Sequence, residues 1–268
     1  MATFALPARV FVREVATSYA RCLRVDTAVR MDVDAARRQH AAYVATIRRL
    51  GVTVDAIPTD DACPDACFVE DTAVLLPRGA VLTRPGAEAR RSEIADVGAA
   101  LDGHMAVHTM SGAATLDGGD VLRVDGQLFV GISSRTNLDG AHFLARIAAM
   151  DGLGTVTLTV REGLHLKSAC TLASASVLVY DANVLRDDDL TAFRDAGLTC
   201  IAASEPSGAN VLALGRSVLV SAAAPRTAER LAATGLDVRV VDVGEMHKGD
   251  GALTCLSLRV PAPGAWCT

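Results

Sequence analysis

A thiol near the end of the chain has surroundings that suit a nucleophile. Cys255 follows the polar, glycine-rich run His247-Lys-Gly-Asp-Gly-Ala-Leu-Thr and precedes the alternating residues 256–260. This pattern is typical of a loop that enters a half-buried strand. A thiol at that junction, beside Asp250, could attack an electrophilic carbon. A cysteine taken alone is more often a buried structural residue.

Four other stretches share this build, with polar residues set into an apolar run. Their marker residues, taken together with the cysteine, recur every 45 to 48 residues. A period of this length indicates repeated supersecondary units arranged as a propeller or an array. Five units closed into a ring would bring two acids, a histidine, an amide and a thiol to one axis. The five markers are Glu70, Asp117, His165, Asn210 and Cys255.

The intervals between the markers contain the same series of predicted elements. In the second unit, a polar strand at residues 115–124 is followed by a partner strand at 127–132, a helix at 137–150 and a strand at 155–160. Polar strands are also predicted at residues 67–76, 164–172 and 210–214. We therefore predict a single α/β domain over residues 1–268, built from five ββαβ modules.

Two predictions concern the first module. Apolar residues at helical spacing predict a helix at residues 34–50, capped by Asp34 and ended by Gly51. The strand after Cys255 has no partner in its own part of the chain, so we expect it to pair with the apolar run at residues 10–13. This pairing would join the two ends of the chain.

The composition restricts the classes of protein that the chain can represent. Half of the 268 residues are hydrophobic and only 4% are aromatic, so the core must consist mostly of Ala, Val and Leu. The net charge of −5, without a basic cluster, disfavours nucleic acid as a partner. No secretory signal or membrane-spanning run is expected. The seven scattered cysteines disfavour a disulfide framework and suit a reducing cytoplasm.

The histidine marker could supply acid–base chemistry. His165 lies in Leu-His-Leu-Lys, where a lone histidine is more often a satisfied structural group. Its position in phase with Cys255 favours a role in protonating a leaving amine and then activating water. Asp117, in Leu-Asp-Gly-Gly-Asp, could be a simple turn residue, or it could orient His165 as the third member of a triad.

A group of acids and two arginines could bind a charged ligand. Asp65, Glu70 and Asp71 lie within one short segment, and a carboxylate directed toward a central pocket would pair with a planar cation such as guanidinium. Arg84 and Arg135 each follow a predicted partner strand. Such arginines are usually solvated, but two at the same place in successive modules could grip a carboxylate.

Six segments, taken together, resemble the dimethylarginine dimethylaminohydrolases of the guanidino-group modifying superfamily. The resemblance spans about residues 10–260 and implies a five-module α/β propeller, the pentein fold. It also implies hydrolysis of asymmetric dimethyl-L-arginine, or of the monomethyl form, to L-citrulline and a methylamine, without a metal or organic cofactor. The matching segments, in family order, are residues 64–71, 83–87, 115–121, 130–137, 164–168 and 250–255.

The same resemblance implies roles for individual residues. Cys255 would be the nucleophile and would form a thiouronium intermediate, His165 would be the acid and base, and Asp117 would orient it. The remaining residues would contact the substrate: Glu70 and Asp71 the guanidinium, Asp65 the α-ammonium, Arg84 and Arg135 the α-carboxylate, with Gly249 and Tyr19 (in Tyr19-Ala-Arg-Cys-Leu) near the ligand.

Other interpretations remain open at this point. An arginine deiminase or an amidinotransferase would use related residues, but these enzymes are normally longer. A non-catalytic ligand-binding propeller would keep the acids and arginines while tolerating loss of the thiol and imidazole. A generic cysteine amidase would not need the acids and arginines together. The expected partner is a small guanidino amino acid, with no nucleic acid or membrane, and a homodimer is compatible with the sequence.

Overall fold

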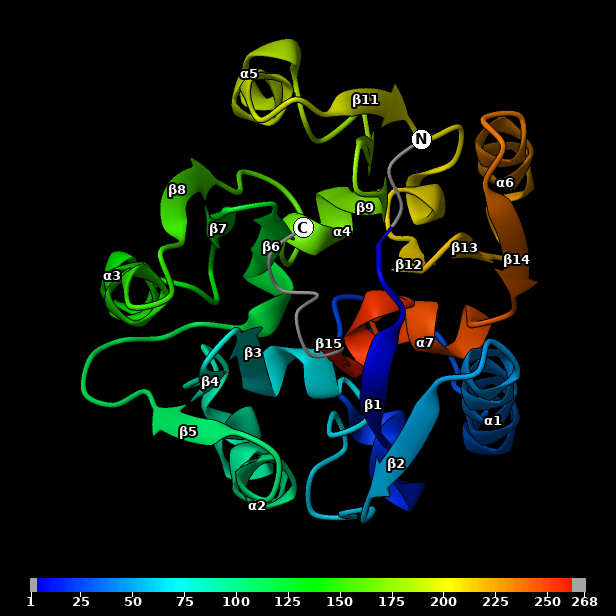
Figure 1. Cartoon of the computed structure of the whole chain (residues 1–268). Helices are drawn as coiled ribbons and strands as arrows, with labels where there is room; N and C mark the ends of the chain where they lie inside the picture. Colours follow the sequence, from blue (N-terminus) through cyan, green and yellow to red (C-terminus); the bar gives the residue numbers. More distant parts are fainter. Residues whose placement is uncertain (1–3, 262–268) are drawn as a thin grey trace.

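Five three-stranded sheets surround a common axis, with their long helices on the outside (Figure 1). The computed structural model describes residues 4–261. In each sheet the middle strand pairs antiparallel with one neighbour and parallel with the other. This arrangement confirms the predicted five-module α/β propeller.

The strands follow the predicted repeat. In sheet order they are β15 (Leu258–Pro261), β1 (Pro7–Arg13) and β2 (Thr53–Ile57); β3 (Ala73–Leu76), β4 (Gly79–Leu82) and β5 (Ala106–Thr109); β6 (Val121–Val124), β7 (Gln127–Ile132) and β8 (Gly154–Thr159); β9 (Cys170–Ser174), β10 (Val177–Tyr180) and β11 (Thr199–Ala202); and β12 (Leu212–Leu214), β13 (Ser217–Ser221) and β14 (Asp237–Val241).

One peripheral helix connects the middle strand of each sheet to the parallel outer strand. Its apolar face packs on the sheet, and the opposite face is polar, as amphipathic helices require. These helices are α1 (Val33–Arg49), α2 (Ile94–Asp102), α3 (Leu138–Ala149), α5 (Asp187–Asp195) and α6 (Pro225–Ala232). A further helix, α7 (Gly244–Lys248), precedes the segment that carries Cys255.

The predicted cap of the first helix is wrong by two residues. Helix α1 begins at Val33, and the side chain of Asp32 accepts a hydrogen bond from the Ala35 amide at 2.8 Å. Asp34 lies inside the first turn, where an acid is favourable but cannot act as the cap. Gly51 follows the helix with φ of +86°, as predicted for a residue that ends it.

The two ends of the described chain close the ring. Strand β1 pairs antiparallel with β15, with Val10 opposite Arg259 and Phe11 opposite Leu258. The predicted pairing of the cysteine-containing module is therefore confirmed. Figure 1 shows the blue and red parts of the chain meeting in this sheet.

The prediction of continuous polar strands is wrong in four modules, and the strand predicted at residues 210–214 is present but shorter, as β12. Each marker lies in or beside a single helical turn that precedes a shorter inner strand, because a turn satisfies its own amides and points successive side chains in different directions around the axis. The turns also pack closely: a Cβ at Gly118 would lie 2.0 Å from the Glu70 carbonyl oxygen. The turns are η2 (Val69–Thr72), η4 (Gly118–Asp120), α4 (Leu166–Ala169), η5 (Pro206–Gly208) and η6 (Thr254–Leu256).

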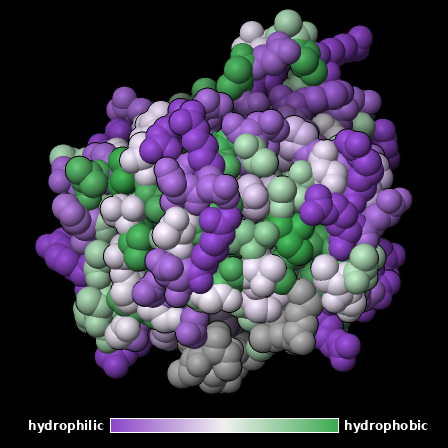
Figure 2. Space-filling model, turned by 90° about the horizontal axis from the view of Figure 1, so that it is seen from above, coloured by the Kyte–Doolittle hydropathy of each residue, from purple (hydrophilic) through white to green (hydrophobic). Residues whose placement is uncertain are grey.

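The surface is mixed in character. On the side seen in Figure 2, hydrophilic side chains are interspersed with smaller hydrophobic groups. Within residues 4–261, no helix has both the length and the apolar character needed to cross a membrane. The large hydrophobic side chains exposed in this part of the chain are Leu6, Leu23, Val25, Leu138, Met150 and Val240.

Candidate active site

A cavity of about 170 Å³ is lined by both the predicted nucleophile and the predicted acid–base group. Cys255 reaches it from η6, and His165 reaches it from the N-cap of α4. The repeat therefore brings these two markers to one site, although 90 residues separate them in the sequence. Other residues in the wall are Gly119, Lys167, Ser168, Ser207, Asn210, His247, Asp250 and Gly251.

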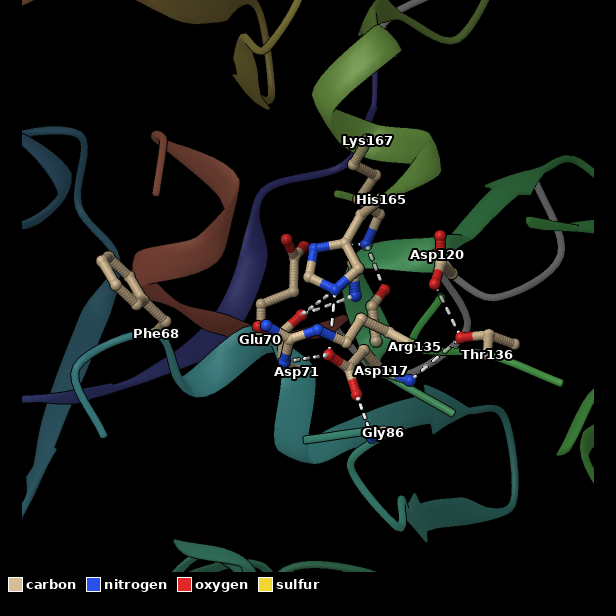
Figure 3. A network of polar contacts seen from close by, with 12 residues as sticks. Phe68, Glu70, Asp71, Gly86, Asp117, Asp120, Arg135, Thr136, His165 and Lys167 are labelled. Atoms are coloured by element: carbon tan, nitrogen blue, oxygen red, sulfur yellow. Dashed lines mark hydrogen bonds and ion pairs between the residues drawn. The ribbon is translucent and has the colours of Figure 1, made fainter. Parts of the chain in front are cut away.

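His165 is buried against two carboxylates (Figure 3). Its Nε2 lies 2.9 Å from Asp117 Oδ2 and 3.9 Å from Asp71 Oδ1. Burial alone would lower the pKa of His165, but the charge of Asp71 and the hydrogen bond with Asp117 outweigh it and raise the pKa to about 9. His165 therefore carries a proton at neutral pH, as a general acid must.

Asp117 is held by hydrogen bonds from the neighbouring module and from its own. Its Oδ1 accepts a hydrogen bond from the Gly86 amide at 2.8 Å, and its own amide donates to Thr136 Oγ1 at 3.1 Å. Arg135 Nη1 lies 3.7 Å from Asp117 Oδ2 and, among the described residues, has no hydrogen-bond partner. Asp117 thus has one oxygen fixed by the backbone and the other directed at His165 (Figure 3).

Asp71 belongs to a buried ion cluster. Its Oδ2 accepts from Arg90 Nη1 at 2.6 Å, and its Oδ1 accepts from the Gly119 amide at 3.0 Å. Arg90 also pairs with Glu93 at 2.9 Å. Burial opposes ionisation of Asp71, but His165 and Arg90 overcome this effect and lower its pKa to about 2. Asp71 is therefore negatively charged at every pH at which the protein is expected to stay folded.

Glu70 lies at the centre of a second charged group. Its Oε1 accepts from Lys167 Nζ and from Arg259 Nη2, each at 2.8 Å, whereas its buried Oε2 has no hydrogen-bond partner within residues 4–261. Lys167 lines both the cavity of Cys255 and another of about 280 Å³, which Glu70 and Arg259 also line. Lys167 therefore belongs to the walls of both cavities, whereas Glu70 and Arg259 line only the larger one.

Cys255 is neutral in this environment. Burial, followed by the charges of Glu70 and Asp71, raises the pKa of its thiol to about 12. A cysteine attacks as the thiolate, and the neutral thiol is a poor nucleophile. A cation bound beside these carboxylates would oppose their effect on the thiol pKa, because an opposite charge favours the thiolate. The site thus suits a thiol that ionises when a cationic ligand binds.

Comparisons with known proteins agree on one family. A family model described as N,N dimethylarginine dimethylhydrolase, eukaryotic, matches residues 11–189. The chain is 40% identical over 236 residues to the N(G),N(G)-dimethylarginine dimethylaminohydrolase of Streptomyces coelicolor, covering 86% of this chain and 88% of that protein. The chain belongs to the dimethylarginine dimethylaminohydrolase family.

Solved structures extend this result to the fold. A cysteine-to-serine mutant of the dimethylarginine dimethylaminohydrolase from Pseudomonas aeruginosa, in complex with citrulline, superposes with a TM-score of 0.89 at 29% identity, over 96% of this chain and 100% of that chain. An arginine dihydrolase domain at 19% identity, with a TM-score of 0.84, shares the fold. The fold predicted from the family resemblance is therefore confirmed.

Two other residues named from the family resemblance, Tyr19 and Gly249, pack against each other. A Cβ at Gly249 would lie 2.6 Å from the Tyr19 hydroxyl and 3.1 Å from Cys22 Sγ. The Tyr19 hydroxyl donates to the Glu245 carbonyl at 3.1 Å, and its side chain is fully buried. The pair joins the N-terminal segment to the loop before the nucleophile, where its large and small side chains complement each other.

Replacing Gly249 by alanine should destabilise the protein by about 1–3 kcal/mol, because the added methyl group overpacks the space beside Tyr19. Tyr19→Phe removes the closest atom, so the double variant should lose at least about 0.5 kcal/mol less than the sum of the two single changes. Chemical denaturation of the four proteins measures this coupling. Gly103→Ala is the control, since nothing lies within 4 Å of its Cβ position; additive losses would contradict the proposed contact.

Asp65 and Arg84 have different surroundings. Both oxygens of Asp65 accept from the Leu23 amide at 3.1 Å, and burial raises the Asp65 pKa. Arg84 forms an isolated β-bridge with Leu116. Within residues 4–261, the backbone of Arg84 pairs with Leu116, which directly precedes Asp117. The guanidinium of Arg135, by contrast, lies beside the Asp117 carboxylate itself.

The acid–base group could also offer ligands to a metal. One atom each of Asp71, Asp117 and His165 lie within 4.8 Å of one another. A metal requires the neutral imidazole, so it would have to displace the proton that the two carboxylates hold on His165. These three side chains are therefore better suited to keeping a proton on His165 than to binding a metal ion.

Several residues at the site were not predicted from the sequence. Arg90 lies in a 3-10 helix outside the repeated segments, and no local pattern marks it. Lys167 and Asp120 do lie in segments that the resemblance contains, but their roles follow from long-range contacts: Asp120 Oδ1 accepts from the Leu166 amide at 2.9 Å and so holds the turn after His165. His247 fixes the Gly251 carbonyl through Nδ1 at 3.1 Å.

Proposed function

We propose that this protein hydrolyses Nω,Nω-dimethyl-L-arginine, and the monomethyl form, to L-citrulline and dimethylamine or methylamine. The observation that carries the proposal is the pairing of a neutral Cys255 thiol with a charged His165 in one cavity, beside two acids. Relatives that carry the dimethylarginine dimethylaminohydrolase name, one of them in complex with citrulline, support it.

The first half of the reaction makes a covalent intermediate. Binding of the guanidinium lowers the thiol pKa of Cys255, and its proton passes to water. The thiolate Sγ then attacks the guanidinium carbon and forms a C–S bond. His165 donates its proton to the substituted nitrogen, the C–N bond breaks, and dimethylamine leaves. An S-alkylthiouronium remains on Cys255.

The second half releases the product. The neutral His165 takes a proton from water, and the hydroxide adds to the thiouronium carbon. The C–S bond of the tetrahedral intermediate then breaks, and its hydroxyl proton passes to the departing thiolate, so citrulline leaves and Cys255 returns to a neutral thiol. One water molecule is consumed in the cycle. Asp117 keeps the imidazole in position and stabilises its charged form throughout.

The charged groups around the cavity would divide the recognition of the substrate. We assign the guanidinium to Asp71 and Glu70, the α-ammonium to Asp65, and the α-carboxylate to Arg135 together with Arg84. Within residues 4–261, Arg135 Nη1 and Glu70 Oε2 are buried without a hydrogen-bond partner, which supports this assignment because buried polar atoms are normally hydrogen-bonded. Tyr19 and Gly249 would shape the site from behind the loop that precedes the nucleophile.

We propose that residues 1–268 form one catalytic domain and that the protein acts in the cytoplasm. The scattered cysteines support a reducing compartment, since six described ones are free thiols. A homodimer stays a prediction that sedimentation of the purified protein would test.

Product analysis tests the reaction. The purified protein is incubated separately with asymmetric dimethylarginine and with arginine, and citrulline, dimethylamine and ammonia are quantified. Citrulline and dimethylamine in equal amounts, absent with Cys255→Ala, are expected. Ammonia from arginine instead would assign the protein to the deiminases, and no product from either substrate would contradict the proposed function.

A further inference from the structure

The amide marker of the repeat, Asn210, makes three side-chain hydrogen bonds at the catalytic cavity. Its Nδ2 donates to the Lys167 carbonyl and to Thr254 Oγ1, each at 2.9 Å, and its Oδ1 accepts from the Thr254 amide at 3.0 Å. These partners fix the orientation of the amide, because a carbonyl can only accept and a backbone amide can only donate. Asn210 is buried and lines the cavity.

The partners of Asn210 are next to the two reacting groups. Thr254 immediately precedes Cys255, and Lys167 lies two residues after His165. The histidine and the cysteine belong to modules that are not neighbours in the ring, and the module of Asn210 lies between them. The amide therefore connects the turn that carries the acid to the turn that carries the nucleophile.

The backbone of Asn210 is held independently of its side chain. Thr171 Oγ1 donates to the Ala209 carbonyl at 2.7 Å and accepts from the Val211 amide at 2.8 Å. These two bonds anchor the residues on both sides of Asn210 to β9. The side-chain amide is thus not needed to hold its own segment, and its three bonds act between the flanking modules.

We infer that Asn210 is a positioning residue that sets the distance and direction between the Cys255 thiol and the His165 imidazole. Two donors and one acceptor on a short, planar group match the three partners. A carboxylate at this position would repel the Lys167 carbonyl and place a negative charge in the wall of the cavity that Cys255 also lines. The inference rests on the proposed function, since the acid and the nucleophile must act on the same carbon.

The test compares Asn210→Ala and Asn210→Asp with the wild-type protein. For each, we would measure kcat and KM with asymmetric dimethylarginine, the melting temperature, and the pH profile of Cys255 alkylation by iodoacetamide, read by peptide mass spectrometry. We expect kcat to fall about 10²-fold, the loss that misplaced reacting groups can cause, while KM changes less than about threefold. In Asn210→Asp, the alkylation profile should move to higher pH.

Asn137→Ala is the matched control. Asn137 also makes three side-chain hydrogen bonds, accepting from the Thr115 and Gly140 amides and donating to the Ala113 carbonyl. Its loss should lower the melting temperature as Asn210→Ala does, with kcat and the alkylation profile unchanged.

The outcomes separate this inference from the proposed function. If Asn210→Ala lowers the melting temperature but leaves kcat and the alkylation profile at wild-type values, the amide is only structural and the inference is wrong. If wild-type protein gives no product while the alkylation profile still shifts in Asn210→Asp, the proposed reaction fails but the placement of the thiol by Asn210 stands. An unchanged profile in both variants overturns the inference whatever the substrate.

Discussion

Glutamine in place of His165 should lower kcat for dimethylarginine hydrolysis by about 10³-fold, within the range ascribed to general acid–base catalysis. The amide can still accept or donate a hydrogen bond near Asp117, but it cannot deliver a proton to the leaving amine or take one from water. Steady-state citrulline formation measures the loss. Retention of more than a tenth of wild-type kcat would exclude His165 as the acid.

His40→Gln provides the matched control for this change. His40 is also buried, on α1, and burial lowers its pKa to about 4, so it is neutral where His165 is charged. We expect kcat to stay within about twofold of wild type, because loss of a buried histidine away from the cavity affects stability rather than proton transfer. An equal loss in both variants would point to a general effect of removing a buried imidazole.

The charge of His165 makes both the unfolding free energy and kcat depend on pH. Its pKa rises from 6.5 to about 9 on folding, so its stabilising contribution is complete below pH 6.5 and is lost as the pH rises through about 9. Over this window the unfolding free energy of the wild type should fall, and that of His165→Gln should fall less. The kcat of the wild type should decline through the same range as the acid loses its proton.

Glu70→Gln should cost about 3–5 kcal/mol of unfolding free energy, since removing one partner of a buried ion pair leaves the others uncompensated. Lys167 and Arg259 would both lose the negative charge of the carboxylate whose oxygen lies 2.8 Å from each. Urea denaturation measures the loss. We also expect KM for dimethylarginine to rise, because the proposed guanidinium contact loses its charge.

Asp187→Asn is the control for Glu70. It removes the same charge from a pair with Arg194 that lies 2.8 Å apart on the surface. Exposed pairs contribute about 0–1 kcal/mol, so its effect should be small. If the two variants lost similar amounts of unfolding free energy, burial would not make the ion pairs of Glu70 more important for stability than an exposed pair.

The repeat made much of the fold and the main chemistry predictable. Glu70, Asp117, His165 and Cys255 occupy corresponding places in different modules. Residues that recur at a regular interval in the sequence therefore lie near one another around the axis. Their short helical turns were mistaken for strands, because three or four residues bounded by apolar runs carry too little periodicity to separate the two conformations.

Other features depended on distance in three dimensions and had no local signal. Arg90 becomes part of the site because burial places its guanidinium between Asp71 and Glu93. The complementary packing of Tyr19 and Gly249 joins residues 230 positions apart. A single sequence contains the side chains for these contacts but does not indicate which of them meet.

The pairing of β1 with β15 has a consequence for the order in which the protein becomes active. During synthesis, β1 emerges among the first elements and β15 among the last, so one edge of β1 stays unpaired while the other modules form. An unpaired edge is a template for pairing with other chains. The thiol arrives with the strand that covers this edge. The nucleophile is therefore placed in the same step that covers this edge of β1, and a chain in which β1 and β15 have not paired has no assembled active site.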